Sequence, residues 1–221
     1  MPATGAAARP PILVDEESLF DWMQLHVREL LIALLVVIIA GGGVYLYRSA
    51  SATQAAQAEQ ALVAPEQSLA AGNLPLAQSD LRRVMTRYAN TGAATQAAML
   101  LADTYYRQGK YADGIAALQQ VSANRAAKEF SPSIERLIAD GYVQQGKPKE
   151  AAPHFVAGAA KTPYPTERAR LRASAARAYA AGGDTAAAVA IWRSLLDESK
   201  SGEANEAQLM LGELTVRAAK P

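Results

Sequence analysis

Residues 101–118 read LADTYYRQGKYADGIAAL, and a related stretch, IADGYVQQGKPKEAAPHF, occupies 138–155, 37 residues further on. A third copy, AARAYAAGGDTAAAVAIW, follows after the same interval at 175–192. All three share a tyrosine, a glycine four residues later, a small residue five after the glycine, and a bulky apolar residue four after that. A fixed period of this length predicts a stack of repeated helical units.

The glycine column and the small-residue column each have four members. Glycine adopts a positive φ at low cost, so it can end one helix and turn the chain back. A small residue lets the second helix cross the first closely. The two columns predict four helical hairpins, with turns at Gly72, Gly109, Gly146 and Gly183 and crossings at Ala77, Gly114, Ala151 and Ala188.

The expected helix boundaries follow from these two columns and from the glycine-, proline- and asparagine-containing segments between them. Alanine, the best helix former, supplies much of the apolar content, which favours an all-α fold. The last helix has no partner after it and is expected to cap the stack. The expected helices lie near 53–71, 74–89, 92–108, 111–122, 130–145, 148–160, 166–181, 184–198 and 203–217.

The repeated pattern resembles the tetratricopeptide repeat. It runs through Leu101, Ala102, Tyr105, Gly109 and Tyr111 to Gly114 and Leu118, and the two later copies keep most of it. It departs from that family in its longer period and in lacking the early tryptophan and the terminal proline. The resemblance implies an α-solenoid of helical hairpins that binds other proteins and is not an enzyme.

An uncharged apolar stretch, LLIALLVVIIAGGGVYLY, occupies residues 30–47. As a helix it would be about 27 Å long, close to the hydrocarbon thickness of a bilayer. It predicts a transmembrane helix over 30–48, with interface anchors at Trp22, Tyr45, Tyr47 and Arg48. A cleaved signal peptide is the alternative, because small residues follow the run, but the run is long for one and the tail before it is acidic.

The small residues within this stretch have two possible interpretations. Ala33, Ala40, Gly41, Gly42 and Gly43 could give a face against which a neighbouring helix packs closely. Glycine is also simply common in membrane helices. Residues 1–29 form an N-terminal tail, whose part from Asp15 onward has the spacing of a short amphipathic helix, either an interface anchor or a docking surface.

The layout of the whole chain, with tail 1–29, span 30–48 and repeat domain 49–221, resembles the YfgM-like family of ancillary translocon subunits. That resemblance implies a single-pass bacterial inner-membrane protein with a cytoplasmic N-terminus and a periplasmic C-terminal domain. It implies protein partners in an inner-membrane complex, the SecYEG translocon, and periplasmic chaperones. Charge near the span is too sparse to orient it. The alternative is a structural or assembly subunit of a stable respiratory or photosynthetic complex.

Composition argues against several other functions. A net charge of +1 gives no basic stripe for nucleic acid, and the chain has no cysteine. The two histidines lie on either side of the span, and no catalytic, phosphate-binding or metal-binding motif is present. We therefore expect no cofactor, metal or small-molecule substrate, and expect protein and lipid as partners. His154 is expected to be a partly exposed packing or surface residue.

Two sets of charged residues, one basic and one acidic, are each expected to lie on a helix face. The basic run of Arg168, Arg170, Arg172 and Arg177 is expected to be a solvated helix face, with binding of acidic partners or lipid headgroups as the alternative. The acidic residues Glu203, Glu206 and Glu213 lie at helical spacing and also predict a solvated face.

Overall fold

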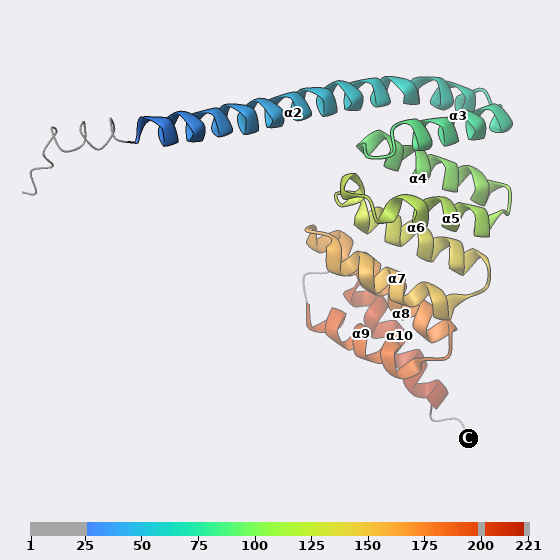
Figure 1. The fold of residues 1–221 in the computed structure, drawn as a ribbon. Helices are drawn as coiled ribbons and strands as arrows, with labels where there is room; N and C mark the ends of the chain where they lie inside the picture. Colours follow the sequence, from blue (N-terminus) through green and yellow to red (C-terminus); the bar gives the residue numbers. More distant parts are fainter. Residues whose placement is uncertain (1–25, 199–201, 219–221) are drawn as a thin grey trace, which may run out of the picture. The chain divides into compact units, whose positions relative to one another are not determined.

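The computed structural model describes residues 26–198 and 202–218 (Figure 1). Within these ranges every regular element is helical, which confirms the all-α class. The elements are α2 (Val27–Ala70), α3 (Leu74–Arg87), α4 (Gly92–Arg107), α5 (Tyr111–Ser122), the 3-10 helix η1 (Arg125–Ala127), α6 (Ser131–Gln144), α7 (Pro148–Lys161), α8 (Pro165–Ala181), α9 (Thr185–Asp197) and α10 (Ala204–Ala218).

Helix α2 runs without a break from the apolar stretch into the first hairpin. A separate helix beginning near residue 53 was expected, and the structure shows one helix of 44 residues instead. The segment Ser49–Thr53 contains neither glycine nor proline, so nothing in it stops a helix. By its internal contacts the chain divides into two compact units, residues 1–52 and 53–221, which are described separately. The predicted amphipathic helix lies largely outside the described residues.

Within residues 53–221 the helices form antiparallel hairpins that stack in chain order (Figure 1). The four column glycines have φ values of 73°, 73°, 70° and 87°. The residue after each glycine donates its backbone N–H to the carbonyl five residues earlier, as Lys110 does to Tyr105 at 2.9 Å. This is the Schellman closure of a helix end, and it explains why the turns lie at the 37-residue register.

The small and bulky columns both lie in the core. Ala77, Ala151 and Ala188 are fully buried, and Gly114 is buried as well. The bulky column is buried between the two helices of each hairpin: Leu81, Leu118, Phe155 and Trp192. Burying each such side chain stabilises the fold by roughly 1.5–3 kcal/mol. The columns therefore set how closely the helices of each hairpin pack.

Candidate interaction surfaces

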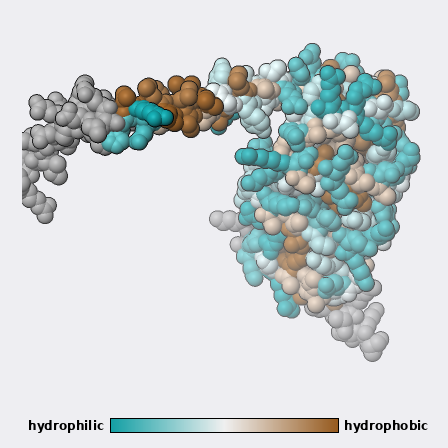
Figure 2. Space-filling model, viewed as in Figure 1, coloured by the Kyte–Doolittle hydropathy of each residue, from teal (hydrophilic) through white to brown (hydrophobic). Residues whose placement is uncertain are grey.

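The apolar half of α2 is exposed within its own unit. Its large side chains between Leu31 and Leu46 are each more than half exposed, and other described residues bury none of the apolar window. Exposed apolar surface of this extent requires lipid or protein to cover it. Figure 2 shows this part of α2 as a brown, hydrophobic surface. The helix is long and apolar enough to cross a membrane.

The small residues of this window surround the helix instead of forming one stripe. Successive helical residues point about 100° apart, so Gly41, Gly42 and Gly43 face three directions. Ala33 and Ala40, seven residues apart, lie on nearly the same side. A Cβ added at any of the three glycines would meet no atom within 4 Å. The glycines form a narrow segment that a neighbouring helix could approach from several sides.

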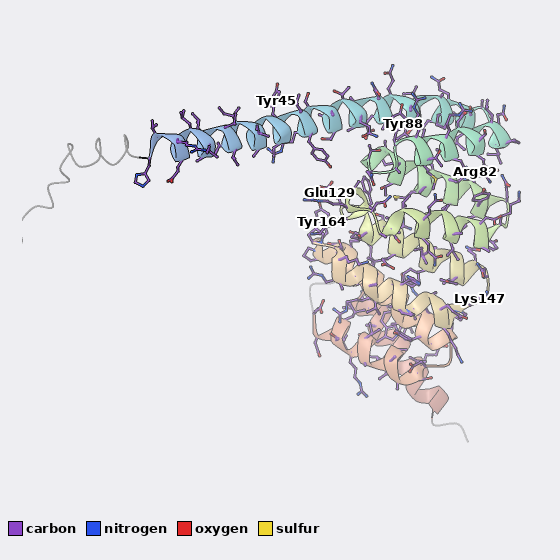
Figure 3. The ribbon with its side chains drawn as sticks, viewed as in Figure 1. Tyr45, Arg82, Tyr88, Glu129, Lys147 and Tyr164 are labelled. Atoms are coloured by element: carbon purple, nitrogen blue, oxygen red, sulfur yellow. The ribbon has the colours of Figure 1, made fainter. Side chains whose placement is uncertain are left out.

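The aromatic residues at the end of the window point outward. Tyr45 and Tyr47 are 72% and 76% exposed, and Figure 3 shows the Tyr45 ring extending from α2. Arg48 follows them, and its carbonyl oxygen accepts a hydrogen bond from Ser51 at 2.9 Å. This order of apolar run, tyrosines and arginine is the order found at a lipid-water interface. Trp22, the anchor predicted at the other end, lies outside the described residues.

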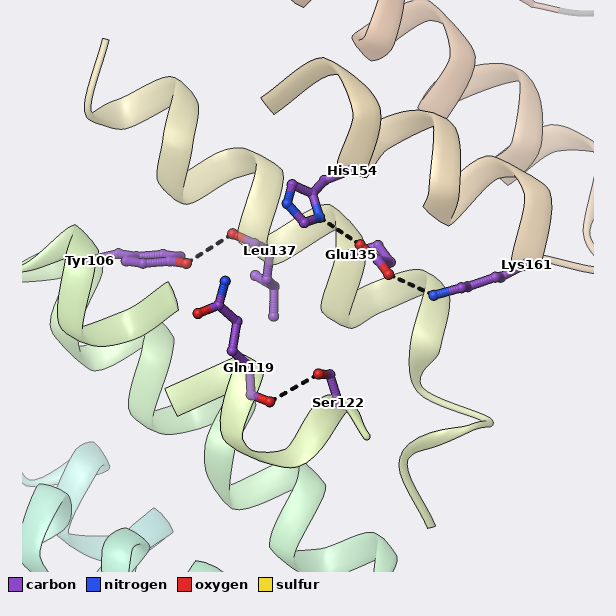
Figure 4. A network of polar contacts seen from close by, with 7 residues as sticks. All are labelled: Tyr106, Gln119, Ser122, Glu135, Leu137, His154 and Lys161. Atoms are coloured by element: carbon purple, nitrogen blue, oxygen red, sulfur yellow. Dashed lines mark hydrogen bonds and ion pairs between the residues drawn. The ribbon is translucent and has the colours of Figure 1, made fainter. Parts of the chain in front are cut away.

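In the repeat unit, Tyr106 connects the second and third hairpins (Figure 4). Its hydroxyl on α4 donates a hydrogen bond to the carbonyl oxygen of Leu137 on α6 at 2.9 Å. Two glycines make room for the ring: a Cβ at Gly114 would lie 2.4 Å from a ring carbon, and one at Gly141 would lie 2.5 Å from the hydroxyl oxygen. Burial, together with the charge of Asp140, raises the pKa of Tyr106 above its usual range, so the phenol remains a donor.

The Tyr106 contact was not predicted, although the sequence carried a signal for it. Gly114 is the one glycine in a column that is otherwise alanine, and it lies in the hairpin that contains Tyr106. A column member smaller than its counterparts indicates that a large neighbour occupies the space. The 37-residue comparison alone does not identify that neighbour, because Val143 and Ala180 occupy the equivalents of Tyr106.

A second polar contact joins α6 to α7 around Glu135 (Figure 4). His154 Nδ1 lies 2.7 Å from one carboxylate oxygen of Glu135, and Lys161 Nζ lies 2.6 Å from the other. The imidazole also stacks on the ring of Tyr142, with centroids 5.6 Å apart. Burial alone would raise the pKa of Glu135, but the hydrogen bonds and charges of Lys161 and His154 outweigh it and hold the pKa below its usual value. His154 is thus a half-buried packing residue, as expected, with a polar partner.

The basic run on α8 is largely solvated, as predicted: Arg168, Arg170 and Arg177 are exposed, and Arg172 is half-buried. Its arginines also bind groups of the same chain. Arg172 binds Glu198 and Ser194 on and after α9, and Arg168 donates to the carbonyl oxygen of Thr162 at 3.2 Å.

The acidic residues are less solvated than predicted at two of three positions, because Glu203 and Glu206 are half-buried beside arginines of α8. Arg177 lies 3.2 Å from Glu206, and Arg170 lies 3.9 Å from Glu203, whose side chain is largely buried. Glu213 is exposed, as predicted. These pairs attach α10 to α8, and sequence periodicity cannot identify them because the partners belong to different hairpins.

The described residues also include no cluster of side chains that could bind a metal. Among residues 26–198 and 202–218, no three histidine, aspartate or glutamate side chains are grouped as a possible metal site. A hollow of about 310 Å³ lies between α3 and α5, with Arg82 and Tyr105 among its lining residues.

Comparison with known proteins supports the fold. A family model described as a tetratricopeptide repeat-like domain matches residues 21–216, which include both the apolar stretch and the repeats. Similar solved structures include TPR-like repeats of a Podosopora anserina kinesin light chain, with a TM-score of 0.55 and 18% identity over 72% of this chain and 84% of that one. MamA protein is similar with a TM-score of 0.52 and 14% identity over 72% of this chain and 86% of that one.

These solved structures show the shared fold alone. A search of curated proteins found no match. The family model covers most of the chain, and its tetratricopeptide repeat-like description agrees with the stacked hairpins, the glycine turns and the buried columns. The chain therefore belongs to the tetratricopeptide repeat-like domain family.

Proposed function

We propose that this protein is a membrane-anchored scaffold that holds other proteins through its stacked hairpins. The observation that carries the proposal is the exposed apolar part of α2 in one chain with a repeat unit of interaction-type fold. The family model begins at residue 21, so the apolar stretch belongs to the shared family pattern together with the repeats. A stack of hairpins offers an extended surface to a partner, which suits binding better than catalysis.

The proposed arrangement follows the sequence. Residues 30–48 cross the bilayer, Tyr45, Tyr47 and Arg48 lie at one interface, and residues 49–221 form the interaction domain. A backbone in lipid must satisfy all its hydrogen bonds internally, and a continuous helix such as α2 does so. The orientation, with a cytoplasmic N-terminus and a periplasmic repeat domain in a bacterial inner membrane, rests on the resemblance to the YfgM-like family.

The orientation is tested by adding protease to spheroplasts that express the full chain. Digestion of the repeat domain before the inner membrane is broken supports a periplasmic location. Survival of the domain until lysis contradicts it. A periplasmic control protein and a cytoplasmic control protein verify that the membrane is intact in the same sample.

The proposed partner is an inner-membrane complex such as the protein translocon, contacted through the membrane helix as well as the repeats. Glycine costs about 1 kcal/mol of helix propensity relative to alanine, and close packing against a partner helix would offset that cost at Gly41, Gly42 and Gly43. Changing all three to leucine should leave insertion intact and reduce copurification of the complex in mild detergent. Changing Leu34, Leu35 and Val36 to alanine is the matched control within the same helix, since these side chains are equally exposed.

Two results would contradict this role of the glycines. Either the leucine variant copurifies the complex as the native chain does, or the alanine control loses it equally. The ratio of this protein to the copurified complex then distinguishes a scaffold that associates transiently from a permanent subunit. A fixed ratio that survives detergent washing would favour a structural or assembly subunit of a stable membrane complex.

A further inference from the structure

The loop between α7 and α8 exposes an aromatic ring between two prolines. Tyr164 is 67% exposed, and Pro163 and Pro165 on either side of it are exposed as well. It is the most exposed of the large apolar side chains described between residues 53 and 198, and it lies at the edge of the repeat unit (Figure 3). Tyrosine is one of the side chains that contribute most to the affinity of protein interfaces.

The backbone of this loop is close to a polyproline II helix. A residue before proline is driven to extended backbone angles, and both Thr162 and Tyr164 precede a proline. Thr162 has φ −78° and ψ 133°, and Tyr164 has φ −89° and ψ 117°. The ideal polyproline II helix has φ of about −75° and ψ of about 145°, with about three residues per turn. Residues 162–165 therefore form a little more than one turn of such a helix.

Hydrogen bonds within the chain hold the segment in this conformation. The Thr162 hydroxyl donates to the Glu167 carboxylate and accepts the N–H of Tyr164 at 3.3 Å. Arg168 donates to two carbonyls of the segment: its guanidinium to Thr162 at 3.2 Å and its backbone N–H to Tyr164 at 3.0 Å. Among the hydrogen bonds of the described residues, none uses the Pro163 carbonyl, so this acceptor is available to a partner. The segment is ordered before a partner arrives, which lowers the entropy cost of binding.

The earlier loops between hairpins lack this segment. Residues 125–128, which lie 37 positions before it, read Arg-Ala-Ala-Lys and include η1. Residues 88–91, another 37 positions earlier, read Tyr-Ala-Asn-Thr. Neither loop contains proline, yet each joins two hairpins. The fold alone therefore does not account for the Pro-Tyr-Pro sequence.

The exposed charges beside the segment are basic. Of the charged side chains between residues 161 and 168, Lys161 and Arg168 are exposed, whereas Glu167 is half-buried. The Arg168 guanidinium uses one nitrogen on the Thr162 carbonyl, so donors remain for a carboxylate. A partner surface with carboxylates at its rim would complement this charge.

We propose that residues 162–165 are a preformed polyproline II ligand that docks into an aromatic-lined groove of a partner protein. Pro163 and Tyr164 pack on the aromatic side chains, a donor of the groove binds the Pro163 carbonyl, and carboxylates at the rim pair with Arg168. Aromatic-lined grooves recognise such segments because a preformed polyproline II helix has little entropy to lose. The inference rests on the proposed scaffold function. Its test reports on this loop alone, so a negative result leaves the association of the membrane helix with its complex unaffected.

The test is site-specific photocrosslinking in membranes from cells that naturally make the protein. p-Benzoylphenylalanine replaces Thr166, an exposed residue that follows the segment, so residues 162–165 stay native. Irradiation should join the full chain to one protein, and mass spectrometry should place the attachment beside a groove with aromatic side chains and a carboxylate. The same photoreactive residue at Gln144, an exposed position on α6, should give less than about a tenth of that adduct.

Substitutions in the segment and a competing peptide assign the adduct to it. Tyr164→Ala should lower the yield at least about tenfold, whereas Tyr164→Phe should keep most of it because the ring makes the contact. Replacing both prolines by alanine should lower the yield at least about threefold, because the segment is then less ordered before binding. The peptide acetyl-Lys-Thr-Pro-Tyr-Pro-Thr amide should compete with the native chain, and its Tyr-to-Ala form should not. The competition needs no variant of the protein, so it holds even if a substitution impairs folding.

Several results would overturn the proposal. Absence of an adduct, an equal yield from Gln144, or a yield that neither Tyr164→Ala nor the peptide lowers overturns the docking. An attachment site without aromatic side chains overturns the polyproline II assignment. Raising the salt concentration should lower the yield, because salt screens exposed charges. A yield that is independent of salt overturns the pairing of partner carboxylates with Arg168.

Discussion

Gly141→Ala tests whether the Tyr106 contact limits how the second and third hairpins pack. A Cβ at residue 141 would lie 2.5 Å from the Tyr106 hydroxyl oxygen and 2.8 Å from both Tyr106 Cζ and Ile115 Cγ1. The tyrosine cannot easily move aside, because its hydroxyl is bonded to the Leu137 carbonyl. Overpacking of this kind costs about 1–3 kcal/mol, whereas alanine gains up to about 1 kcal/mol of helix propensity over glycine.

The expected net effect is a loss of about 1–2 kcal/mol in the free energy of unfolding. Thermal unfolding of the full chain in detergent, followed by circular dichroism, should show a Tm lower by about 2–4 °C for each kcal/mol lost. Gly212→Ala is the matched control, since a Cβ there meets nothing within 4 Å in helix α10. That variant should be as stable as the native chain or slightly more so.

A double-mutant cycle assigns the loss to Tyr106. In a Tyr106→Ala background the largest steric conflict is absent, so Gly141→Ala should cost at least about 1 kcal/mol less than it does in the native chain. Native-like stability of Gly141→Ala alone, or an identical loss with and without Tyr106, would refute the reasoning.

Three other substitutions test separate parts of the structure by the same melts. Ala151→Leu overpacks a helix crossing and should cost about 1–3 kcal/mol, whereas the exposed Glu150→Leu should cost far less; equal effects would contradict the crossing. Gly109→Ala forces alanine to a φ of 73° in open space and should cost about 1–2 kcal/mol through backbone strain alone, an interpretation that fails if the variant melts like the native chain. Because the pKa of Glu135 is lowered in the folded protein, its stabilising contribution is present above about pH 4 and is lost as the pH falls further. Glu135→Gln should therefore be less stable than the native chain near neutral pH and should lose less stability on acidification. If the variant and the native chain lose stability equally on acidification, the Glu135 carboxylate is not the group responsible.

Helix positions were predictable because their turns depend on local backbone chemistry. The column glycine ends a helix in every hairpin, and the predicted ends differ from the observed ones by a residue or two. The continuity of α2 was not predicted, because a change from apolar to polar composition after Arg48 looks like a boundary. The alanine-rich stretch after that arginine consists largely of good helix formers, and α2 continues through it.

Contacts between hairpins were harder to predict than the hairpins themselves. The pairing of Arg172 with Glu198 joins residues 26 positions apart, and the bond from Tyr106 to Leu137 spans 31. A period identifies equivalent residues, but it does not say which residues of neighbouring hairpins meet. The sequence therefore predicts the repeated unit well and the exceptions to the repeat poorly, and exceptions such as Tyr106 distinguish one hairpin from another.

The ion pairs of α8 have a consequence for how the repeat unit comes apart. In a linear array each unit is stabilised chiefly by its neighbours, so an end unit with one neighbour opens first. Here α10 is attached to α8 partly through Arg170 and Arg177, whose pairs with Glu203 and Glu206 are partly open to solvent and weaken as salt screens them. Raising ionic strength should therefore fray the C-terminal end before the rest unfolds, and the fully buried Trp192 beneath it would report that opening by its fluorescence.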